Sequence, residues 1–359
     1  KATVNFVMKK IESRQGEEYK LWQKTREWSI EQFAKIYNEL NVKFVRTFYE
    51  SDVIDEGQKI VKKLLREGIL KISDGAVIAD LEKYNLGVLV VLRSDGTATY
   101  PVADLALASE KFKKFKLDKS IYIVDIRQAL YFKQLFKILE LMGYKKEMIH
   151  LGYEFLKLPT GMMSSRTGHV ITFEDLRDQI FVKAQEETKA RHQDWNEEKI
   201  KNVARILALG AMKFEMIKVS ADQVITFDIS KALSFSGYTA AYLQYTYARF
   251  DSILRKAQEI KTKKKSDFSY LSDVKEGELI MKVAKYPEVV VRAGCEYSPS
   301  EIAKYLFELA QTANDYYHLA PVLKAEDDVR IARLALIDSI NQILQNGLDL
   351  LGIEVIKEM

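Results

Sequence analysis

The chain is 359 residues long, with 47% hydrophobic residues, 55 Lys and Arg against 51 Asp and Glu, and a net charge of +4. This composition predicts a folded protein with room for more than one core, and it excludes an intrinsically disordered chain. Because basic and acidic side chains nearly balance, any contact with nucleic acid must come from local patches and not from a global positive field.

Cysteines, histidines and apolar runs limit the classes further. Cys295 is the single cysteine, so it cannot form an internal disulfide, and no apolar run approaches the roughly 18 residues that span a bilayer. The four histidines have no metal-ligand spacing, and we predict no metal site. We expect a cytoplasmic protein without a membrane partner. Since the chain begins Lys-Ala-Thr, we also expect it to be the remaining part of a longer protein.

The first predicted elements are helices with short strands between them. Apolar residues at helical spacing predict a helix over 17–39 and a second over 56–67 that Gly68 ends. Residues 42–48 are a short run of β character, and residues 76–80 are predicted to form a strand.

A strand–helix–strand unit is predicted next. Residues 87–93 are a continuous apolar run of the kind found in buried strands, and a helix begins near Pro101. Strands predicted at 120–125 and 148–155 flank a helix from about 127 to 142 that Gly143 ends. This βαβ spacing predicts parallel pairing, with a ligand crevice at the carboxyl ends of the strands.

Beyond about residue 185 the pattern is helical. Thr172 and Asp175 have the spacing of a capping box, which predicts a helix start. Apolar residues recur at helical spacing from Ile200 to Phe214, and long amphipathic segments follow over 238–260, 276–291, 300–318 and 328–351. These segments predict a helical bundle.

Three polar residues are placed to meet at the predicted crevice. Tyr100 and Asp104 are four residues apart at a helix start, and Gln128 follows the carboxyl end of a strand. A partly buried carboxylate needs a cationic partner, and a guanidinium matches it best through two parallel hydrogen bonds. The spacing equally allows a structural role, in which Asp104 caps its helix or pairs with a protein cation while Tyr100 packs.

A glycine-bounded loop carries the residues suited to phosphate. Between Gly161 and Gly168 lie Ser164, Ser165 and Arg166. The glycines let the backbone bend, while hydroxyls, amides and the guanidinium can bind a polyphosphate. A plain surface turn has the same composition.

This loop resembles a known signature. The order Met163, Ser164, Ser165, Arg166, Gly168 resembles the Lys-Met-Ser-Lys-Ser motif of class I aminoacyl-tRNA synthetases, in the form that arginyl-tRNA synthetases carry. The resemblance implies that these five residues bind ATP and that Ser164, Ser165 and Arg166 are catalytic. Two lysines of the family motif are replaced, by Met162 and Thr167, so the loop is less cationic than in the family.

Two further segments resemble the same family. Residues 94–106 are similar to its pattern Asp-Gly-x-x-x-Tyr-x-x-x-Asp-Ile-Ala, and 124–128 to its glutamine-bearing turn. The resemblance implies that Tyr100, Asp104 and Gln128 hold the side chain of L-arginine. Many family members place a histidine soon after that glutamine, where this chain has Tyr131 and Phe132.

Residues 237–249 resemble the opening of the family's anticodon-binding bundle, with alanines at 240 and 241 in place of Gly-Pro, and residues 334–359 resemble its C-terminus. The resemblance implies contacts with tRNA(Arg) by Tyr242, Gln244, Tyr245 and Arg249. Aromatic rings at this spacing can stack on unpaired bases. Half-buried packing is the alternative for each tyrosine.

The resemblance covers nearly the whole chain and implies an α/β plus all-α protein. A partial Rossmann-type parallel sheet, the second half of a class I catalytic domain, is followed by an α-helical anticodon-binding bundle. The expected domains are an insertion or connective region of the catalytic domain at 1–86, the second Rossmann half with the signature loop at 87–175, a helical connecting (stem-contact) region at 176–235 and the bundle at 236–359. We expect a monomer.

The implied function is that of an arginine–tRNA ligase, which uses ATP with Mg²⁺ to activate L-arginine and then transfers it to tRNA(Arg). The family's second ATP motif, His-x-Gly-His, does not occur in these 359 residues. Because transition-state stabilisation needs both walls of the site, we expect this chain alone not to form arginyl-adenylate at a useful rate. The alternatives are a non-catalytic synthetase-like RNA-binding paralogue or split-gene partner, and an unrelated α/β enzyme with a helical appendage.

Overall fold

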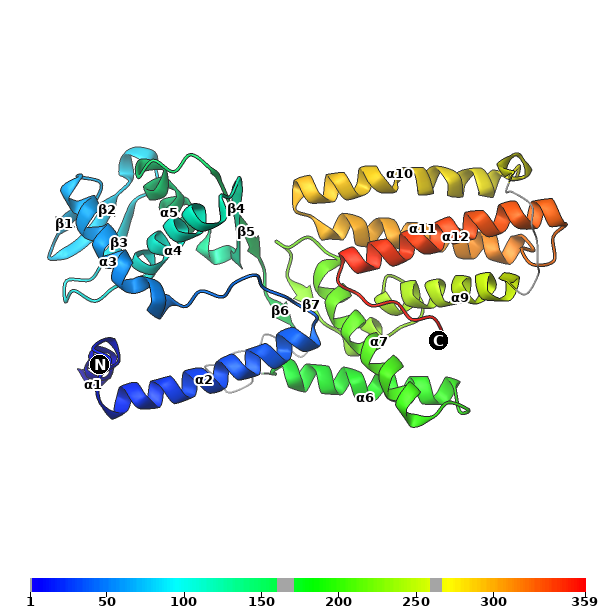
Figure 1. Cartoon of the computed structure of the whole chain (residues 1–359), viewed down its shortest axis with the longest axis horizontal. Helices are drawn as coiled ribbons and strands as arrows, with labels where there is room; N and C mark the ends of the chain where they lie inside the picture. Colours follow the sequence, from blue (N-terminus) through cyan, green and yellow to red (C-terminus); the bar gives the residue numbers. More distant parts are fainter. Residues whose placement is uncertain (1, 160–170, 259–266) are drawn as a thin grey trace. The chain divides into compact units, whose positions relative to one another are not determined.

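The computed structural model describes residues 2–159, 171–258 and 267–359 (Figure 1). The chain divides into two units, Lys1–Tyr49 and Glu50–Met359. The predicted phosphate loop, residues 161–168, lies outside the described residues. Within the described part, no helix is long and apolar enough to cross a membrane.

The first unit is helical. Helices α1 (Ala2–Glu12) and α2 (Gly16–Glu39) form it, which confirms the helix predicted over 17–39. The prediction of β structure at 42–48 is wrong, because the described residues of this unit include no strand with which this segment could pair. An extended segment without a partner leaves its backbone groups to water, and Val45 is 97% exposed.

The second unit opens with helix α3 (Glu50–Arg66) and an antiparallel sheet of β1 (Lys71–Ser73), β2 (Ala76–Asp80) and β3 (Val88–Leu92), joined by η1 (Glu82–Tyr84). The strand predicted at 76–80 is confirmed. The run at 87–93 does form a strand, but its expected burial is wrong, since Val88 and Val90 are 46% and 42% exposed. An antiparallel strand buries one face and leaves the other to solvent, whereas the prediction assumed a strand covered on both faces.

A parallel βαβ unit follows. Helix α4 (Tyr100–Phe115) precedes β4 (Lys119–Asp125), and the short η2 (Ile126–Gln128) leads into α5 (Ala129–Leu141) and β5 (Glu147–Tyr153). Strands β4 and β5 pair in parallel from Lys119 opposite Glu147 to Asp125 opposite Tyr153, which confirms the predicted unit. Its core is built by α3, α4 and α5 through the buried residues Val61, Leu64, Val102, Leu105, Leu135 and Ile138.

Helices α6 (Phe173–Arg191) and α7 (Glu197–Ile217) pack on each other beside the two-stranded parallel pair β6 (Leu156–Lys157) and β7 (Ile225–Thr226). The predicted capping box is confirmed, because the Thr172 hydroxyl accepts from the Asp175 amide and the Asp175 carboxylate accepts from the Thr172 amide. The apolar positions of α7 are buried against α6 as the periodicity predicts: Val203, Ala204, Leu207 and Ala211.

The closing helices form the predicted bundle. After the short α8 (Ile229–Ala232) come α9 (Ala240–Gln258), η3 (Phe268–Tyr270), α10 (Val274–Glu296), α11 (Pro299–Leu319) and α12 (Asp327–Leu350). Helices α9 to α12 lie side by side (Figure 1) around one core that includes Leu243, Phe250, Leu309 and Ile340. The domain boundaries expected at 86/87, 175/176 and 235/236 stay predictions.

Candidate functional site

The first turn of α4 is tied to the antiparallel sheet. Thr99 has an extended backbone, and its hydroxyl lies 2.8 and 2.7 Å from the carbonyl oxygens of Val90 and Val91 in β3. Pro101, with its fixed φ, is the second residue of the helix. Tyr100 opens the helix and is 77% exposed, so its ring is available to a ligand.

Asp104 lies one turn further along α4 and is partly buried. Its carboxylate accepts a hydrogen bond from the hydroxyl of Tyr131, in the first turn of α5. Gln128, three residues before Tyr131, is exposed at the point where η2 ends and α5 begins. The structure therefore brings Asp104 to the start of α5, beyond the carboxyl end of β4, and leaves Tyr100 and Gln128 accessible.

The turn that carries Gln128 is held by Asp125. The Asp125 carboxylate accepts from the backbone amide of Arg127 at 2.9 Å and from its guanidinium at 2.8 and 2.5 Å. These hydrogen bonds to Arg127 lower the pKa of Asp125 to about 2, so the cap stays ionised at neutral pH. The local sequence Asp-Ile-Arg-Gln thus explains how the exposed glutamine is placed at the start of α5.

The charge environment of Asp104 suits a cationic ligand. Burial raises the pKa of Asp104, while the hydrogen bond from Tyr131 and the charge of Lys111 act in the opposite direction. Among the residues that the structure describes, no lysine or arginine lies within ion-pair distance of this carboxylate, and Lys111 acts on it only through its charge. Lys111 is instead hydrogen-bonded to Ser120 at 3.1 Å and lies over the ring of Tyr122. Asp104 therefore neither caps its helix nor pairs with a protein cation in the described part of the chain.

Tyr131 is a site residue whose role the sequence did not reveal. Burial and the neighbouring Asp104 charge raise the pKa of Tyr131, so its hydroxyl stays protonated and donates. Its only sequence signal is its place three residues after Gln128. The loop residues Met163, Ser164, Ser165, Arg166 and Gly168 lie outside the described residues, so their predicted ATP contacts stay predictions.

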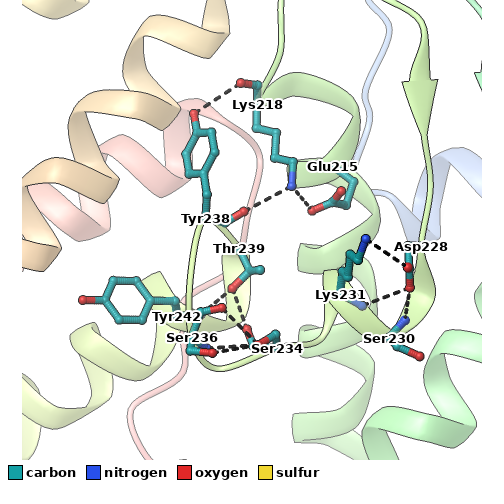
Figure 2. Close-up of polar contacts among 10 residues, drawn as sticks. All are labelled: Glu215, Lys218, Asp228, Ser230, Lys231, Ser234, Ser236, Tyr238, Thr239 and Tyr242. Carbon is teal, nitrogen blue, oxygen red and sulfur yellow. Dashed lines mark hydrogen bonds and ion pairs between the residues drawn. The ribbon is translucent and has the colours of Figure 1, made fainter.

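A second group of candidate residues lies on α9, whose start is fixed by the preceding loop. Figure 2 shows Lys218, at the end of α7, bonded to the carboxylate of Glu215 at 2.5 Å and to the carbonyl oxygen of Tyr238 at 3.2 Å. The Tyr238 hydroxyl in turn donates to the Lys218 carbonyl oxygen at 3.2 Å. Thr239 then caps α9, since its hydroxyl accepts from the Tyr242 amide at 3.1 Å and donates to Ser234 at 2.6 Å.

Tyr242, Tyr245 and Arg249 follow at positions that share one face of α9, and each is partly exposed. Tyr245 lines a cavity of about 330 Å³ between α6, α7 and α9. The guanidinium of Arg191 covers the ring of Phe235 at this cavity, 3.7 Å from its centre. The remaining lining residues include His192, Val203, Leu207 and Met359. Aromatic faces beside cations are the surface on which unpaired bases stack.

The position of Gln244 contradicts the expectation that this residue contacts tRNA. Its side chain is fully buried, its amide nitrogen donates to the Glu354 carbonyl oxygen at 2.7 Å, and its amide packs on Gly210 of α7. It stands two residues after Tyr242, a spacing that turns a helical side chain to another face. No surface of Gln244 is left for RNA, so its role is to hold the C-terminal segment against α9.

We expect Gln244→Ala to lower the free energy of unfolding by about 2–3 kcal/mol, because it empties a fully buried position and removes a hydrogen bond. Urea unfolding measures the loss. The affinity for tRNA should stay that of the unaltered chain. Weaker tRNA binding without a loss of stability would show that Gln244 contacts RNA after all.

Similarity to solved structures first defines the class of protein. The chain is similar to the crystal structure of methionyl-tRNA synthetase from Mycobacterium tuberculosis at 12% identity, with a TM-score of 0.57 over 89% of this chain and 77% of that one. It is similar to arginyl-tRNA synthetase of Thermus thermophilus at 27% identity, with a TM-score of 0.83 over 98% of this chain and 68% of that one. The parallel unit with its following helical bundle is the architecture of a class I aminoacyl-tRNA synthetase.

Sequence comparisons then give the family. The family described as tRNA synthetases class I (R), catalytic domain, matches residues 1–228, and the DALR anticodon binding domain matches 243–359. Arginine–tRNA ligase of Bdellovibrio bacteriovorus is 36% identical over 98% of this chain and 61% of its own length. That of Clostridium perfringens is 36% identical over 98% of this chain and 62% of its own length. The chain belongs to the class I arginyl-tRNA synthetases, and it spans about three fifths of the length of these relatives.

Proposed function

We propose that this chain carries the arginine site and the tRNA(Arg) surface of an arginine–tRNA ligase. The observation that supports the proposal most is the partly buried Asp104 carboxylate, one turn into α4, which is hydrogen-bonded to Tyr131 in the first turn of α5. A guanidinium would supply the direct, hydrogen-bonded cation that this carboxylate does not have among the described residues, where Lys111 acts on it only through its charge.

Each residue of the arginine site has a distinct task. Asp104 pairs with the guanidinium and gives the site its preference for a cation. The exposed Tyr100 ring covers the side chain of the ligand, and the exposed Gln128 amide provides a neutral donor and acceptor at the start of α5. Tyr131 is a positioning residue, since it holds the Asp104 carboxylate without touching the ligand.

The activity that we propose for a full-length ligase, and not for this chain alone, is ATP-dependent. A carboxylate oxygen of arginine attacks the α-phosphorus of ATP and pyrophosphate leaves, and a hydroxyl of the terminal ribose of tRNA then attacks the carbonyl carbon while AMP leaves. Ser164, Ser165 and Arg166 are proposed to bind the phosphates. Within the described ranges no group of three or more His, Cys, Asp or Glu could hold a metal ion. We propose that Mg²⁺ enters as part of the substrate, bound to the phosphates of ATP.

The RNA surface is proposed to lie on α9. Tyr242, Tyr245 and Arg249 share one face of this helix, and the cavity beside Tyr245 combines the rings of Phe235 and His192 with the guanidinium of Arg191. An unpaired base of tRNA(Arg) stacked in this cavity would contribute about 1–3 kcal/mol.

We propose that the chain alone does not form arginyl-adenylate at a useful rate. It contains no His-x-Gly-His motif, and the loop lysines of the family are Met162 and Thr167 here. The test is ATP–pyrophosphate exchange with L-arginine and tRNA(Arg), beside calorimetric titration of the same chain with L-arginine. Arginine binding without exchange is expected. Exchange at the rate of a full-length arginine–tRNA ligase would contradict the proposed inactivity, and absence of arginine binding would contradict the proposed site.

The second candidate function is that of a non-catalytic RNA-binding protein or split-gene partner. Met162 and Thr167 favour it, because a loop without its lysines holds a triphosphate less firmly. Arginine binding separates the two functions, since a chain that only binds RNA has no use for an arginine site at Asp104.

Arginine binding is expected to weaken with acidification earlier than at an ordinary aspartate site. Burial raises the pKa of Asp104 above its usual 3.8. The affinity is therefore complete above the raised pKa and is lost as the pH falls through it, because a protonated carboxyl no longer pairs with a guanidinium. Calorimetric titrations with L-arginine over a series of pH values measure the midpoint. A midpoint at or below the usual aspartate value would contradict the role of Asp104.

A further inference from the structure

One buried amide links three residues of α9, two of which are partly exposed. Asn314, on α11, is 8% exposed. Its carbonyl oxygen accepts from Nη1 of Arg249 at 2.9 Å, and its amide nitrogen donates to the Tyr242 hydroxyl at 3.0 Å and to the Thr246 hydroxyl at 2.8 Å. The side chain thus uses its acceptor and both of its donors on α9.

The contact with Arg249 fixes a stacked guanidinium. Nη2 of Arg249 donates to the Tyr245 hydroxyl at 2.9 Å, and the guanidinium carbon lies 4.7 Å from the centre of the Tyr245 ring and 5.5 Å from that of Tyr317. One terminal nitrogen of the Arg249 guanidinium is therefore bonded to Asn314 and the other to Tyr245. The guanidinium also contacts the rings of Tyr245 and Tyr317. Arg249 itself stays partly exposed, and Tyr245 also lines the cavity beside α6 and α7.

Core packing alone does not account for an asparagine at this position. An apolar side chain would fill the space without the cost of burying an amide, and a buried amide is tolerated when its groups are bonded. Here two of the three bonds lead to residues that are partly exposed, Arg249 and Tyr242, and the third leads to the buried Thr246. Asn341, on α12 of the same bundle, is a useful contrast: it is also buried, but its side-chain oxygen has no hydrogen-bond partner in the described part of the chain.

We propose that Asn314 is a positioning residue of the RNA surface, which holds Arg249 in the arrangement that meets a phosphate of tRNA(Arg). The proposal rests on the proposed function, since it assumes that the α9 face binds tRNA. An arginine that is already ordered loses less side-chain freedom on binding than a mobile one, so the hold by Asn314 strengthens the complex without touching RNA.

The experiment measures binding of a tRNA(Arg) transcript to the chain over a series of salt concentrations. Asn314→Leu should weaken binding about tenfold, the factor that corresponds to about 1.4 kcal/mol, and should reduce the slope of log K against log salt by about 1, because one phosphate contact is lost. Asn314→Asp keeps the acceptor toward Arg249 and should lose less affinity than Asn314→Leu. The matched control is Asn341→Leu, which removes a buried amide elsewhere in the bundle and should change neither affinity nor slope.

A double-mutant cycle with Arg249→Leu decides whether Asn314 acts through Arg249. The variant with both substitutions should bind no more weakly than Arg249→Leu alone, whereas additive losses would overturn the proposal. Unchanged affinity and slope in Asn314→Leu would overturn it too, while leaving the proposed RNA surface intact. Absence of tRNA binding by the unaltered chain would instead contradict the proposed function. If Asn314→Leu fails to fold, the cycle is run with Asn314→Asp, for which additivity again counts against the proposal.

Discussion

Asp104→Asn is expected to abolish measurable binding of L-arginine to this chain. The substitution keeps the size of the side chain and its ability to accept from Tyr131, but it removes the only negative charge that we assign to the ligand. Leaving one partner of a buried ion pair uncompensated costs about 3–5 kcal/mol, which lowers affinity at least about a hundredfold. Isothermal titration calorimetry at neutral pH measures the loss.

The matched control for this prediction is Asp118→Asn. The Asp118 side chain is 96% exposed, so its substitution should leave arginine binding unchanged. L-Citrulline, which has the same length but no charge, should bind the unaltered chain as poorly as L-arginine binds Asp104→Asn. An Asp104→Asn variant that keeps the affinity of the unaltered chain would show that the carboxylate only anchors Tyr131.

Local patterns explain why much of the fold could be predicted. The capping box at Thr172 and the apolar periodicity from Ile200 to Phe214 depend on residues three or four apart, and both have the predicted structure. The βαβ unit also follows from local signals, because two apolar runs separated by one helix have few ways to pair. Segments 42–48 and 87–93 were harder, since their structure depends on which strand lies beside them and on which face is covered.

The residues of the candidate sites also differ in whether a local sequence pattern predicts them. Tyr100, Asp104 and Gln128 stand at helix starts and strand ends that the pattern predicts. The roles of Tyr131 and Asn314 could not be predicted in this way, because their partners lie 27 and 65 residues away and no local spacing relates them. The burial of Gln244 could have been predicted from its helix, because a residue two positions after Tyr242 points to another face of α9.

Arg333→Met is expected to lower the free energy of unfolding by about 3–5 kcal/mol, because it leaves a buried carboxylate without its cation. Glu276, on α10, is 1% exposed. One of its oxygens accepts from Nε of Arg333, on α12, at 2.8 Å and from the hydroxyl of Tyr316, on α11, at 2.7 Å. The other oxygen accepts from the Asp273 amide at 3.0 Å and completes the capping box of α10. A single carboxylate therefore joins three helices of the bundle, and it can be neither hydrated nor paired once Arg333 is gone.

Arg292→Met is the matched control for Arg333→Met. Arg292 pairs with Glu301 at 2.7 Å, but their side chains are 48% and 33% exposed, so the loss of this pair should cost no more than about 1 kcal/mol. Urea unfolding at neutral pH compares the two variants through their midpoints at unchanged slope. Adding Glu276→Gln to Arg333→Met should recover part of the loss, because no charge is then left unpaired in the core. Equal costs for Arg333→Met and Arg292→Met, or no recovery by Glu276→Gln, would show that the bundle is held by its apolar core and that the Glu276 cluster contributes little.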